Sequence, residues 1–228
     1  VRMQKDDEEK ALMFKASEMN DTAMAEVKRL LATDKTEIEM DEALLAYYKS
    51  LGASGHSFSP IMGYGANGAN PHHSCDDSRL KPGDSIIVDM GCIYKGYCSD
   101  MTRTIFAGYI PENIKNIYNL VLKNQLQTQK DLREGASIRI ISKNVENDFK
   151  LNGYDLIHSL GHGVGLEIHE LPYINSKNDN LLKENMIITN EPGIYLPNNY
   201  GVRIEDTVLI TKSGCINLTK SDKNYIIT

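Results

Sequence analysis

Residues 88–102, VDMGCIYKGYCSDMT, predict a tight β-hairpin that carries two aspartates. If residues 94–95 form the loop, Asp89 and Asp100 face each other directly; if residues 95–96 form it, they are diagonal neighbours. Both registers place the two carboxylates on one face of the sheet, about 4.5 to 8 Å apart. Like charges at that separation destabilise a hairpin, so either both are solvated surface aspartates or something compensates their charge.

A second hairpin repeats the arrangement in NEPGIY and GVRIEDT. Glu191 and Glu205 lie on expected strands, residues 186–195 and 202–211, at roughly equal distances from the turn Pro197-Asn198-Asn199. A single glutamate in a strand usually faces solvent. Two hairpins that each carry a facing acidic pair are much harder to explain by chance.

Between the two hairpins, residues 158–170, HSLGHGVGLEIHE, hold three of the six histidines. His158, His162 and His169 are separated by glycines, and the glutamate of an H-E-x-x-H zinc helix is missing. The glycines weaken a helix and allow close backbone approach, so we expect an extended segment. One histidine can then bind a metal while its neighbours contact a substrate.

Charge favours a metal site at these residues. Four carboxylates in a small volume would raise one another's pKa values, whereas two divalent cations would neutralise them. An oxygen-rich set with one imidazole suits Mn²⁺, Fe²⁺ or Co²⁺ better than a structural zinc site made of thiolates. The four cysteines also lack structural-zinc spacing.

The remaining pattern predicts an α+β chain in two comparable halves. Helices are expected over residues 6–32, from a capping box at Thr36 to a stop near Gly52, from Pro111 to a break at Gly135, and over 137–149; further strands are expected at 57–61, 85–90 and 98–106. Residues 63–68 match G-x-G-x-x-G, but the prolines and glycine that follow exclude the helix a dinucleotide site needs. We expect a glycine-rich surface loop there, with His72 just beyond it.

Composition limits the classes of function. The chain has 228 residues, 41% hydrophobic and 25% charged, which is typical of a globular protein. A net charge of −6 offers no basic patch for nucleic acid, and no apolar run is long enough for a membrane span. The charged N-terminus does not look like a secretory signal, and the cysteines suggest reduced thiols, so we expect a cytoplasmic protein.

Five motifs now occur in order: NPH at 70–72, the Asp89/Asp100 hairpin, GHGVGLEIHE, NEPGIY and GVRIEDT. From about residue 10 to the end, the chain resembles the metallopeptidases of the pita-bread fold, which include methionine aminopeptidases, Xaa-Pro aminopeptidases and prolidases. The last three motifs look like the Xaa-Pro branch. The resemblance implies an α+β fold of two pseudo-symmetric halves, with a curved antiparallel sheet and helices on the outside.

The resemblance also implies roles for individual residues. The implied metal ligands are Asp89, Asp100, His162, Glu191 and Glu205, with Asp89 on one metal, Asp100 and Glu205 bridging, and His162 and Glu191 on the other. The implied catalytic residues are Glu191 as proton acceptor and His72 and His169 as hydrogen-bond donors to the tetrahedral intermediate; His158, Arg203 and Tyr195 resemble the lining of a proline pocket. Two alternatives stay open: Tyr195 as a packed aromatic, and Arg203 as the structural partner of a carboxylate. His56 and His73 are expected to be bystanders.

These residues imply an exopeptidase with two divalent metal ions that cleaves between an N-terminal residue and a following proline. Its partners would be peptides with proline in second position. We expect it to bind neither nucleic acid nor a membrane, and a homodimer is an open alternative. We expect Mn²⁺, with Co²⁺, Zn²⁺ or Fe²⁺ as alternatives. A methionine aminopeptidase-like enzyme and a non-catalytic binding module on the same fold are the competing hypotheses. We expect residues 1–228 to be the catalytic domain, without the N-terminal domain that is common in the family.

Overall fold

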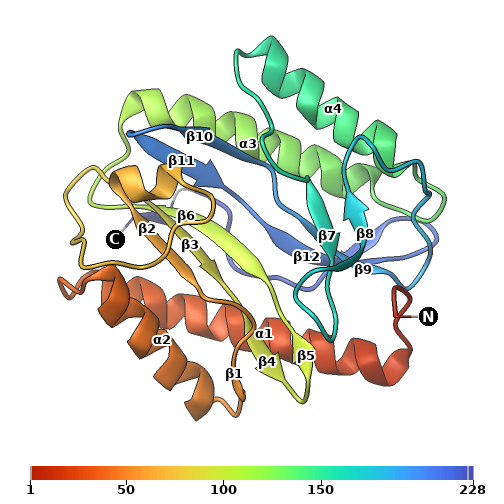
Figure 1. Ribbon diagram of the computed structural model, residues 1–228, viewed down its shortest axis with the longest axis horizontal. Helices are drawn as coiled ribbons and strands as arrows, with labels where there is room; N and C mark the ends of the chain where they lie inside the picture. Colours follow the sequence, from red (N-terminus) through yellow and green to blue (C-terminus); the bar gives the residue numbers. More distant parts are fainter. Residues whose placement is uncertain (1, 225, 228) are drawn as a thin grey trace.

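The computed structural model describes residues 2–224 and 226–227, and it has the α+β organisation expected from the sequence (Figure 1). The helices are α1 (Asp7–Leu31), α2 (Glu37–Ser50), α3 (Glu112–Asp131) and α4 (Ile138–Leu151), with a short 3-10 helix η1 (Gly65–Ala69). The strands are β1 (Gly55–His56), β2 (Ile61–Tyr64), β3 (Ser85–Met90), β4 (Cys92–Tyr94), β5 (Tyr97–Cys98), β6 (Met101–Phe106), β7 (Gly161–Gly163), β8 (Glu170–Ile174), β9 (Ile187–Asn190), β10 (Gly193–Leu196), β11 (Tyr200–Arg203), β12 (Asp206–Ile210), β13 (Cys215–Asn217) and β14 (Ile226–Ile227).

Each half of the molecule packs two helices against its own strands. In Figure 1, α1 and α2 lie on one side of the strands, and α3 and α4 lie on the other. The first half contains the sheet β14-β6-β3-β2, and the second contains the sheet β13-β12-β9-β7-β8 together with the pair β10-β11. The strands therefore form the middle of the molecule, and the helices cover its outside.

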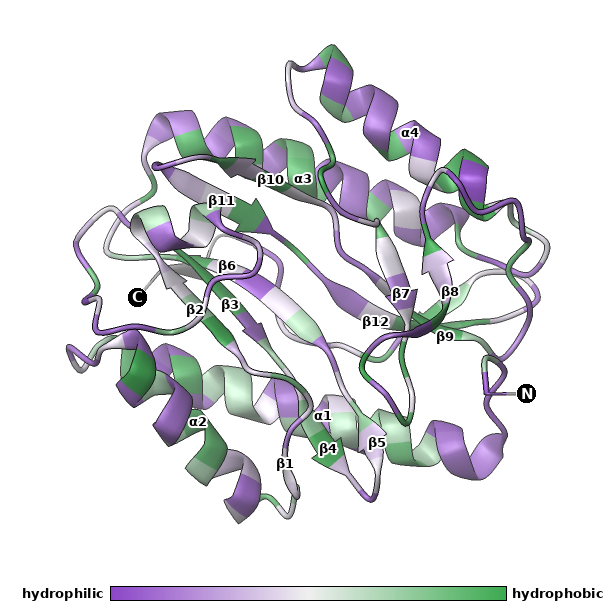
Figure 2. Ribbon diagram, viewed as in Figure 1, coloured by the Kyte–Doolittle hydropathy of each residue, from purple (hydrophilic) through white to green (hydrophobic). Residues whose placement is uncertain are grey.

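The helices begin where their sequences predict. Asp6 and Thr36 cap α1 and α2 with complete capping boxes, because Glu9 and Glu39 return hydrogen bonds to the cap backbone. Green and purple alternate along α1 and α3 in Figure 2, as expected for helices that bury one face.

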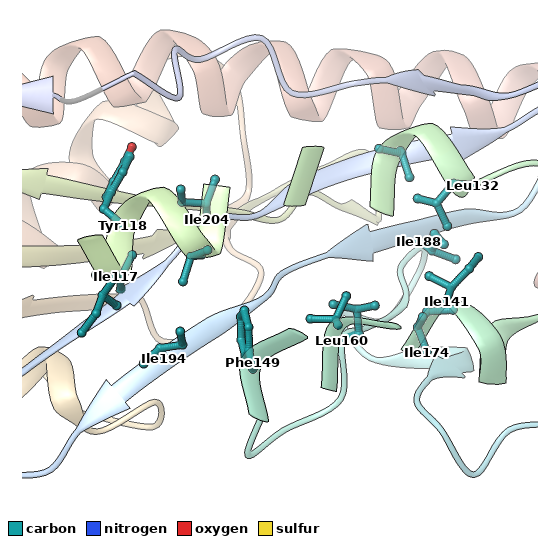
Figure 3. Close-up of a cluster of buried hydrophobic side chains, with 14 of the residues drawn as sticks. Ile117, Tyr118, Leu132, Ile141, Phe149, Leu160, Ile174, Ile188, Ile194 and Ile204 are labelled. Carbon is teal, nitrogen blue, oxygen red and sulfur yellow. The ribbon is translucent and has the colours of Figure 1, made fainter. Parts of the chain in front are cut away.

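Apolar side chains fill the space between the helices and the strands. Phe149 of α4 and Ile117 of α3 belong to one buried cluster with Ile188 of β9 and Ile194 of β10, which Figure 3 draws. A separate cluster joins α1 and α2 to β2, β3 and β6. Among the described residues, no helix combines the length and the apolar character needed to cross a membrane.

The first hairpin adopts the second of its two expected registers. Tyr94 pairs with Tyr97, so Lys95 and Gly96 form the loop, and both have the positive φ of a type I′ turn. Asp89 consequently lies opposite Thr102 in the β3–β6 ladder. Asp100 is its diagonal neighbour on the same face.

The second hairpin has two long arms, and each arm is interrupted at its acidic residue. Gly193 pairs with Arg203 on the turn side, and Asn190 pairs with Asp206 on the other side. The same register places Glu191 opposite Glu205. The expected single strands 186–195 and 202–211 are therefore each split in two, and the carboxylates lie at the breaks.

Of two further sequence predictions, one is wrong and the other is confirmed. The strand expected at residues 57–61 is wrong: β1 ends at His56 and β2 begins at Ile61. Pro60 lacks an N–H for a sheet ladder, and Ser57 instead bonds the carbonyl oxygens of Gly91 and Ser99. The helix required by a dinucleotide motif is missing from the fully described segment 65–84, which has only the 3-10 helix η1, as expected.

The two hairpins cross at a backbone bridge between Thr102 and Glu205. The Glu205 N–H donates to the Thr102 carbonyl oxygen at 3.0 Å. Arg103, fully buried, donates from Nη1 to the carbonyl oxygens of both residues, at 2.8 and 2.5 Å, and from Nη2 to Asp206 Oδ1 at 2.8 Å. Its two remaining N–H groups reach the carbonyls of Ser221 and Asp222, so all five donors are used.

Replacing Arg103 with Met should destabilise the protein strongly, because Asp206 would keep a buried negative charge without its main partner. Breaking a buried ion pair from one side costs about 3–5 kcal/mol, which urea unfolding followed by circular dichroism would measure. Lys15→Met is the matched control, since Lys15 pairs with Glu18 at the surface and its loss should leave the unfolding midpoint nearly unchanged. Equal midpoints for the two variants would contradict the role given to Arg103.

Candidate metal centre

A cavity of about 430 Å³ lies where the two halves meet. The sequence singled out twelve residues as site residues or bystanders, and all but Tyr195 and His56 line this cavity: His72, His73, Asp89, Asp100, His158, His162, His169, Glu191, Arg203 and Glu205. Residues from both hairpins and from the histidine-rich segment are thus brought together, as the sequence predicted. Phe58, Ile61, Ile168 and Tyr173 add apolar surface to the walls.

Hydroxyl groups orient two of the four carboxylates. Thr102 Oγ1 donates to Glu205 Oε2 at 2.6 Å, and Thr189 Oγ1 donates to Glu191 Oε1 at 3.0 Å. Neither threonine was among the site residues expected from the sequence. A signal was present, since Thr189 lies two residues from Glu191 on the same strand face, just as Thr102 does from Asp100.

The glycines around His162 allow the strand β7 to approach its neighbours closely. A Cβ atom on Gly161 would overlap the carbonyl oxygen of Thr189, and one on Gly163 would overlap that of Leu171. The His162 Nδ1 atom lies 3.0 Å from the Gly163 carbonyl oxygen, which can only accept, so Nδ1 carries the proton. Nε2 is left facing Glu191 Oε1 at 3.3 Å and Asp100 Oδ2 at 3.5 Å.

The buried acidic groups repel one another. Burial, followed by the charge of Glu205, holds the pKa of Asp100 well above its usual value; burial and the charge of Glu191 do the same for Glu205. Burial also raises the pKa of Asp89, although Arg203 opposes the rise. Burial acts against ionisation of Glu191 too, but its hydrogen bond and charge interaction with His162 lower its pKa to about 2.

These groups fit divalent cations. One ligand atom each from Asp100, His162 and Glu205 lies within 4.8 Å of the others, and all three side chains are buried. Asp89 Oδ1 is buried and has no hydrogen-bond partner. An unpartnered carboxylate oxygen beside a carboxylate-rich cluster with one imidazole nitrogen is the donor set that a pair of hard or borderline cations accepts.

A chain of hydrogen bonds leads from Asp89 to His158. Arg203 Nη2 lies 2.5 Å from Asp89 Oδ2, and Nη1 donates to the Tyr195 hydroxyl at 2.7 Å. The Nδ1–H of His158 donates a hydrogen bond to the Ser159 carbonyl oxygen, so Nε2 is free to accept from the Tyr195 hydroxyl at 2.9 Å. Arg203 is therefore the partner of a carboxylate, the alternative left open by the sequence, while it also lines the cavity. Tyr195 connects the two lining residues through its hydroxyl.

The other histidines separate into two groups. His72 and His169 are exposed on the cavity wall, and the His169 ring packs edge-on against that of His162 with centroids 4.3 Å apart. Partial burial of the ring and the charge of the neighbouring His162 lower the pKa of His169, so its ring is neutral at neutral pH. His56 packs against Tyr48, away from the cavity, whereas His73 lies on the cavity wall with Nε2 2.6 Å from Glu37.

Comparison with known proteins identifies the class to which this fold and site belong. The model of metallopeptidase family M24 matches residues 11–212, and the chain belongs to this family. Within it, the chain is related to an Xaa-Pro dipeptidase of Pyrococcus furiosus, with 39% identity over 228 residues that cover 99% of this chain and 66% of that protein. It is 34% identical to the uncharacterised peptidase YqhT of Bacillus subtilis, covering 100% of this chain and 65% of YqhT.

The solved structures agree. The X-Pro aminopeptidase of Thermotoga maritima superimposes with a TM-score of 0.96 at 34% identity, covering 100% of this chain and 65% of that one. The fold is thus the α+β pita-bread fold expected from the sequence, and the family implies divalent metal ions. The chain spans about two thirds of the length of these relatives.

Metal binding should weaken as the pH falls, because the raised pKa values of Asp100, Glu205 and His162 mean that protons must leave before a cation binds. Each proton released costs about tenfold in apparent affinity per pH unit. Calorimetric titration of chelated protein with Mn²⁺ at pH 7.5, 6.5 and 5.5 would measure this dependence.

Asp179→Asn is the control for this titration, since Asp179 pairs with Arg139 on the surface and its loss should leave the pH dependence unchanged. Asp100→Ala should abolish stoichiometric loading. Affinities that do not change with pH would show that the carboxylates are not the groups that bind the metal.

Proposed function

We propose that this chain is the catalytic part of a metallo-exopeptidase that hydrolyses the bond between an N-terminal residue and a following proline, as an Xaa-Pro aminopeptidase or dipeptidase. The observation that carries the proposal is the convergence of Asp89, Asp100, His162, Glu191 and Glu205 on one cavity that also presents His158 and Arg203. Relatives named as Xaa-Pro dipeptidase and X-Pro aminopeptidase support the proline specificity.

Five residues would hold two divalent cations, for which we propose Mn²⁺. These residues would be Asp89, Asp100, His162, Glu191 and Glu205. The cations would neutralise the clustered carboxylates, lower the pKa of a water molecule and polarise the scissile carbonyl. Thr102 and Thr189 orient their carboxylates through the hydrogen bonds described above, so the ligands are fixed before a substrate arrives.

The chain's own groups then move the proton and stabilise the developing charge. Glu191, ionised at neutral pH, accepts the proton of the attacking water and passes it to the leaving nitrogen. His72 and His169, both on the cavity wall, donate hydrogen bonds to the oxygen of the tetrahedral intermediate. A neutral imidazole has one N–H for this purpose, which agrees with the lowered pKa of His169.

His158 and Arg203 form the side of the cavity assigned to the leaving proline. Their orientation is fixed by Tyr195, whose hydroxyl accepts from Arg203 and donates to His158. Burial lowers the pKa of His158, so its ring stays neutral and the chain of hydrogen bonds keeps one direction. The nitrogen of a proline residue in a peptide carries no N–H. A proline against this wall would therefore leave no backbone hydrogen-bond donor without a partner.

The proposal is tested by comparing hydrolysis of matched Xaa-Pro and Xaa-Ala peptides by Mn²⁺-loaded protein, with chelated protein as the blank. We expect metal-dependent cleavage that is selective for proline. Metal-dependent cleavage without a preference for proline would replace the proposal with a methionine aminopeptidase-like specificity. A protein that binds two metals but cleaves neither peptide would instead be a binding module on this fold.

Replacing His169 with Ala should lower kcat by about 10²- to 10⁴-fold, because a donor to the transition state is lost. The number of bound metal ions should stay the same, as measured by elemental analysis. His56→Ala is the control, since His56 packs against Tyr48 away from the cavity. If both variants keep the parent kcat, His169 has no part in the reaction.

A further inference from the structure

Glu37 is a fully buried carboxylate outside the cavity. It occupies the first turn of α2, and its side chain has no exposed surface. Oε1 accepts hydrogen bonds from the Tyr64 backbone N–H at 2.8 Å and from Asn67 Nδ2 at 2.9 Å. Oε2 accepts from the Asp76 backbone N–H at 3.0 Å and from His73 Nε2 at 2.6 Å.

These four bonds fill the acceptor capacity of the carboxylate. An ionised carboxylate offers about four lone-pair sites, and each oxygen of Glu37 meets two N–H donors. The position at the N-terminus of α2 favours a negative charge as well. Glu37, His73 and Asp76 could also be regarded as a metal-ligand cluster, but the acceptor sites of Glu37 are already occupied by hydrogen-bond donors.

All four donors belong to one segment, residues 64–76, which we name the His72 segment. It begins at the end of β2, passes through η1 and carries His72 to the cavity wall. One further bond ties it to the same helix end, since the Ile38 N–H group donates to the Asp76 carbonyl oxygen, and the Glu37 N–H donates to the carbonyl oxygen of Ser78, two residues beyond the segment. The start, middle and end of the segment are therefore fixed by one turn of α2.

His72 is the neighbour of a residue that Glu37 holds directly. His73 Nε2 must be the donor to Glu37, because an ionised carboxylate only accepts. The His72 N–H and the His73 N–H both bond Asn70, which closes the turn between η1 and the histidines. With the His73 ring anchored to Glu37 and the backbone turn closed, His72 has little freedom to move away from the cavity.

We propose that Glu37 is a positioning residue for the reaction: it holds the His72 segment so that the His72 imidazole meets the oxygen of the reacting carbonyl. The inference rests on the proposed function for its catalytic consequence, but the anchoring itself does not depend on the substrate. His73, which the sequence led us to expect as a bystander, is part of this anchor.

The test is a double-mutant cycle between Glu37→Gln and His72→Ala. In the Gln variant, an NH₂ group replaces one carboxylate oxygen and faces N–H donors from which that oxygen accepted hydrogen bonds. The segment therefore loses its anchor. Glu37→Gln should lower kcat by about 10- to 100-fold, the effect of a misplaced catalytic group, with little change in KM or in bound metal. In the His72→Ala background the same change should have almost no further effect on kcat, because the group it positions is gone.

Glu42→Gln is the matched control, an exposed glutamate on the same helix. It should leave kcat unchanged in both backgrounds. An additive loss in the cycle, with Glu37→Gln costing the same factor with and without His72, would overturn the positioning role.

Hydrogen exchange measured by mass spectrometry tests the anchor without any substrate. Glu37→Gln should speed exchange in peptides from residues 64–76 and leave α1 and α3 unchanged. If the parent protein cleaves no Xaa-Pro peptide but this exchange pattern is observed, the proposed function fails and the anchor stands. Unchanged exchange across residues 64–76 overturns the anchor whatever the activity.

A second variant keeps the test decisive if Glu37→Gln does not fold. His73→Phe removes one of the four donors and leaves the three others to Glu37 in place. It should lower kcat by a smaller factor than Glu37→Gln, again only when His72 is present. A loss of equal size in the His72→Ala background would contradict the proposal.

Discussion

The crossing of the two hairpins at Thr102 and Glu205 is the constraint on which the rest of the structure depends. One backbone hydrogen bond joins them, and the Arg103 guanidinium bonds both carbonyl oxygens from behind. Each hairpin alone would present a pair of carboxylates to solvent. The crossing turns the two pairs towards each other, and it does so with a buried cation whose five donors are all satisfied.

The crossing separates two groups of buried carboxylates whose negative charges are compensated in different ways. Behind the crossing, Asp206 is neutralised within the protein by Arg103 and Lys223, and these partners, acting against the effect of burial, keep its pKa below the usual value. On the cavity side, Asp100 and Glu205 have no lysine or arginine partner among the described ion pairs, and their pKa values are raised. Arg203 is the one arginine or lysine placed against that cluster among those pairs, and it contacts Asp89. The polypeptide thus completes one cluster itself and leaves the other for cations.

The sequence predicted the parts of this design that follow from local rules. Strand alternation and the equal spacing of Glu191 and Glu205 from their turn were enough to place facing carboxylates, and the glycines around His162 were enough to exclude a zinc helix. Contacts between distant segments could not be read in the same way. The bridge from Thr102 to Glu205 and the bonds from Glu37 to the His72 segment join residues that share no periodic pattern, and the expected strand at 57–61 failed because its pattern ignored the missing N–H of Pro60.

The long second hairpin has a consequence for how its sequence can change in length. Leu196 and Tyr200 are the last pair before the turn, and the register runs unbroken from them to Asn190 and Asp206. An extra residue within the exposed turn 197–199 would enlarge the loop and leave every pair below it in place. An extra residue in either arm would slide Glu191 past Glu205 and turn one of them to the opposite face. Natural variation in length should therefore be confined to the tip, while both arms keep equal lengths.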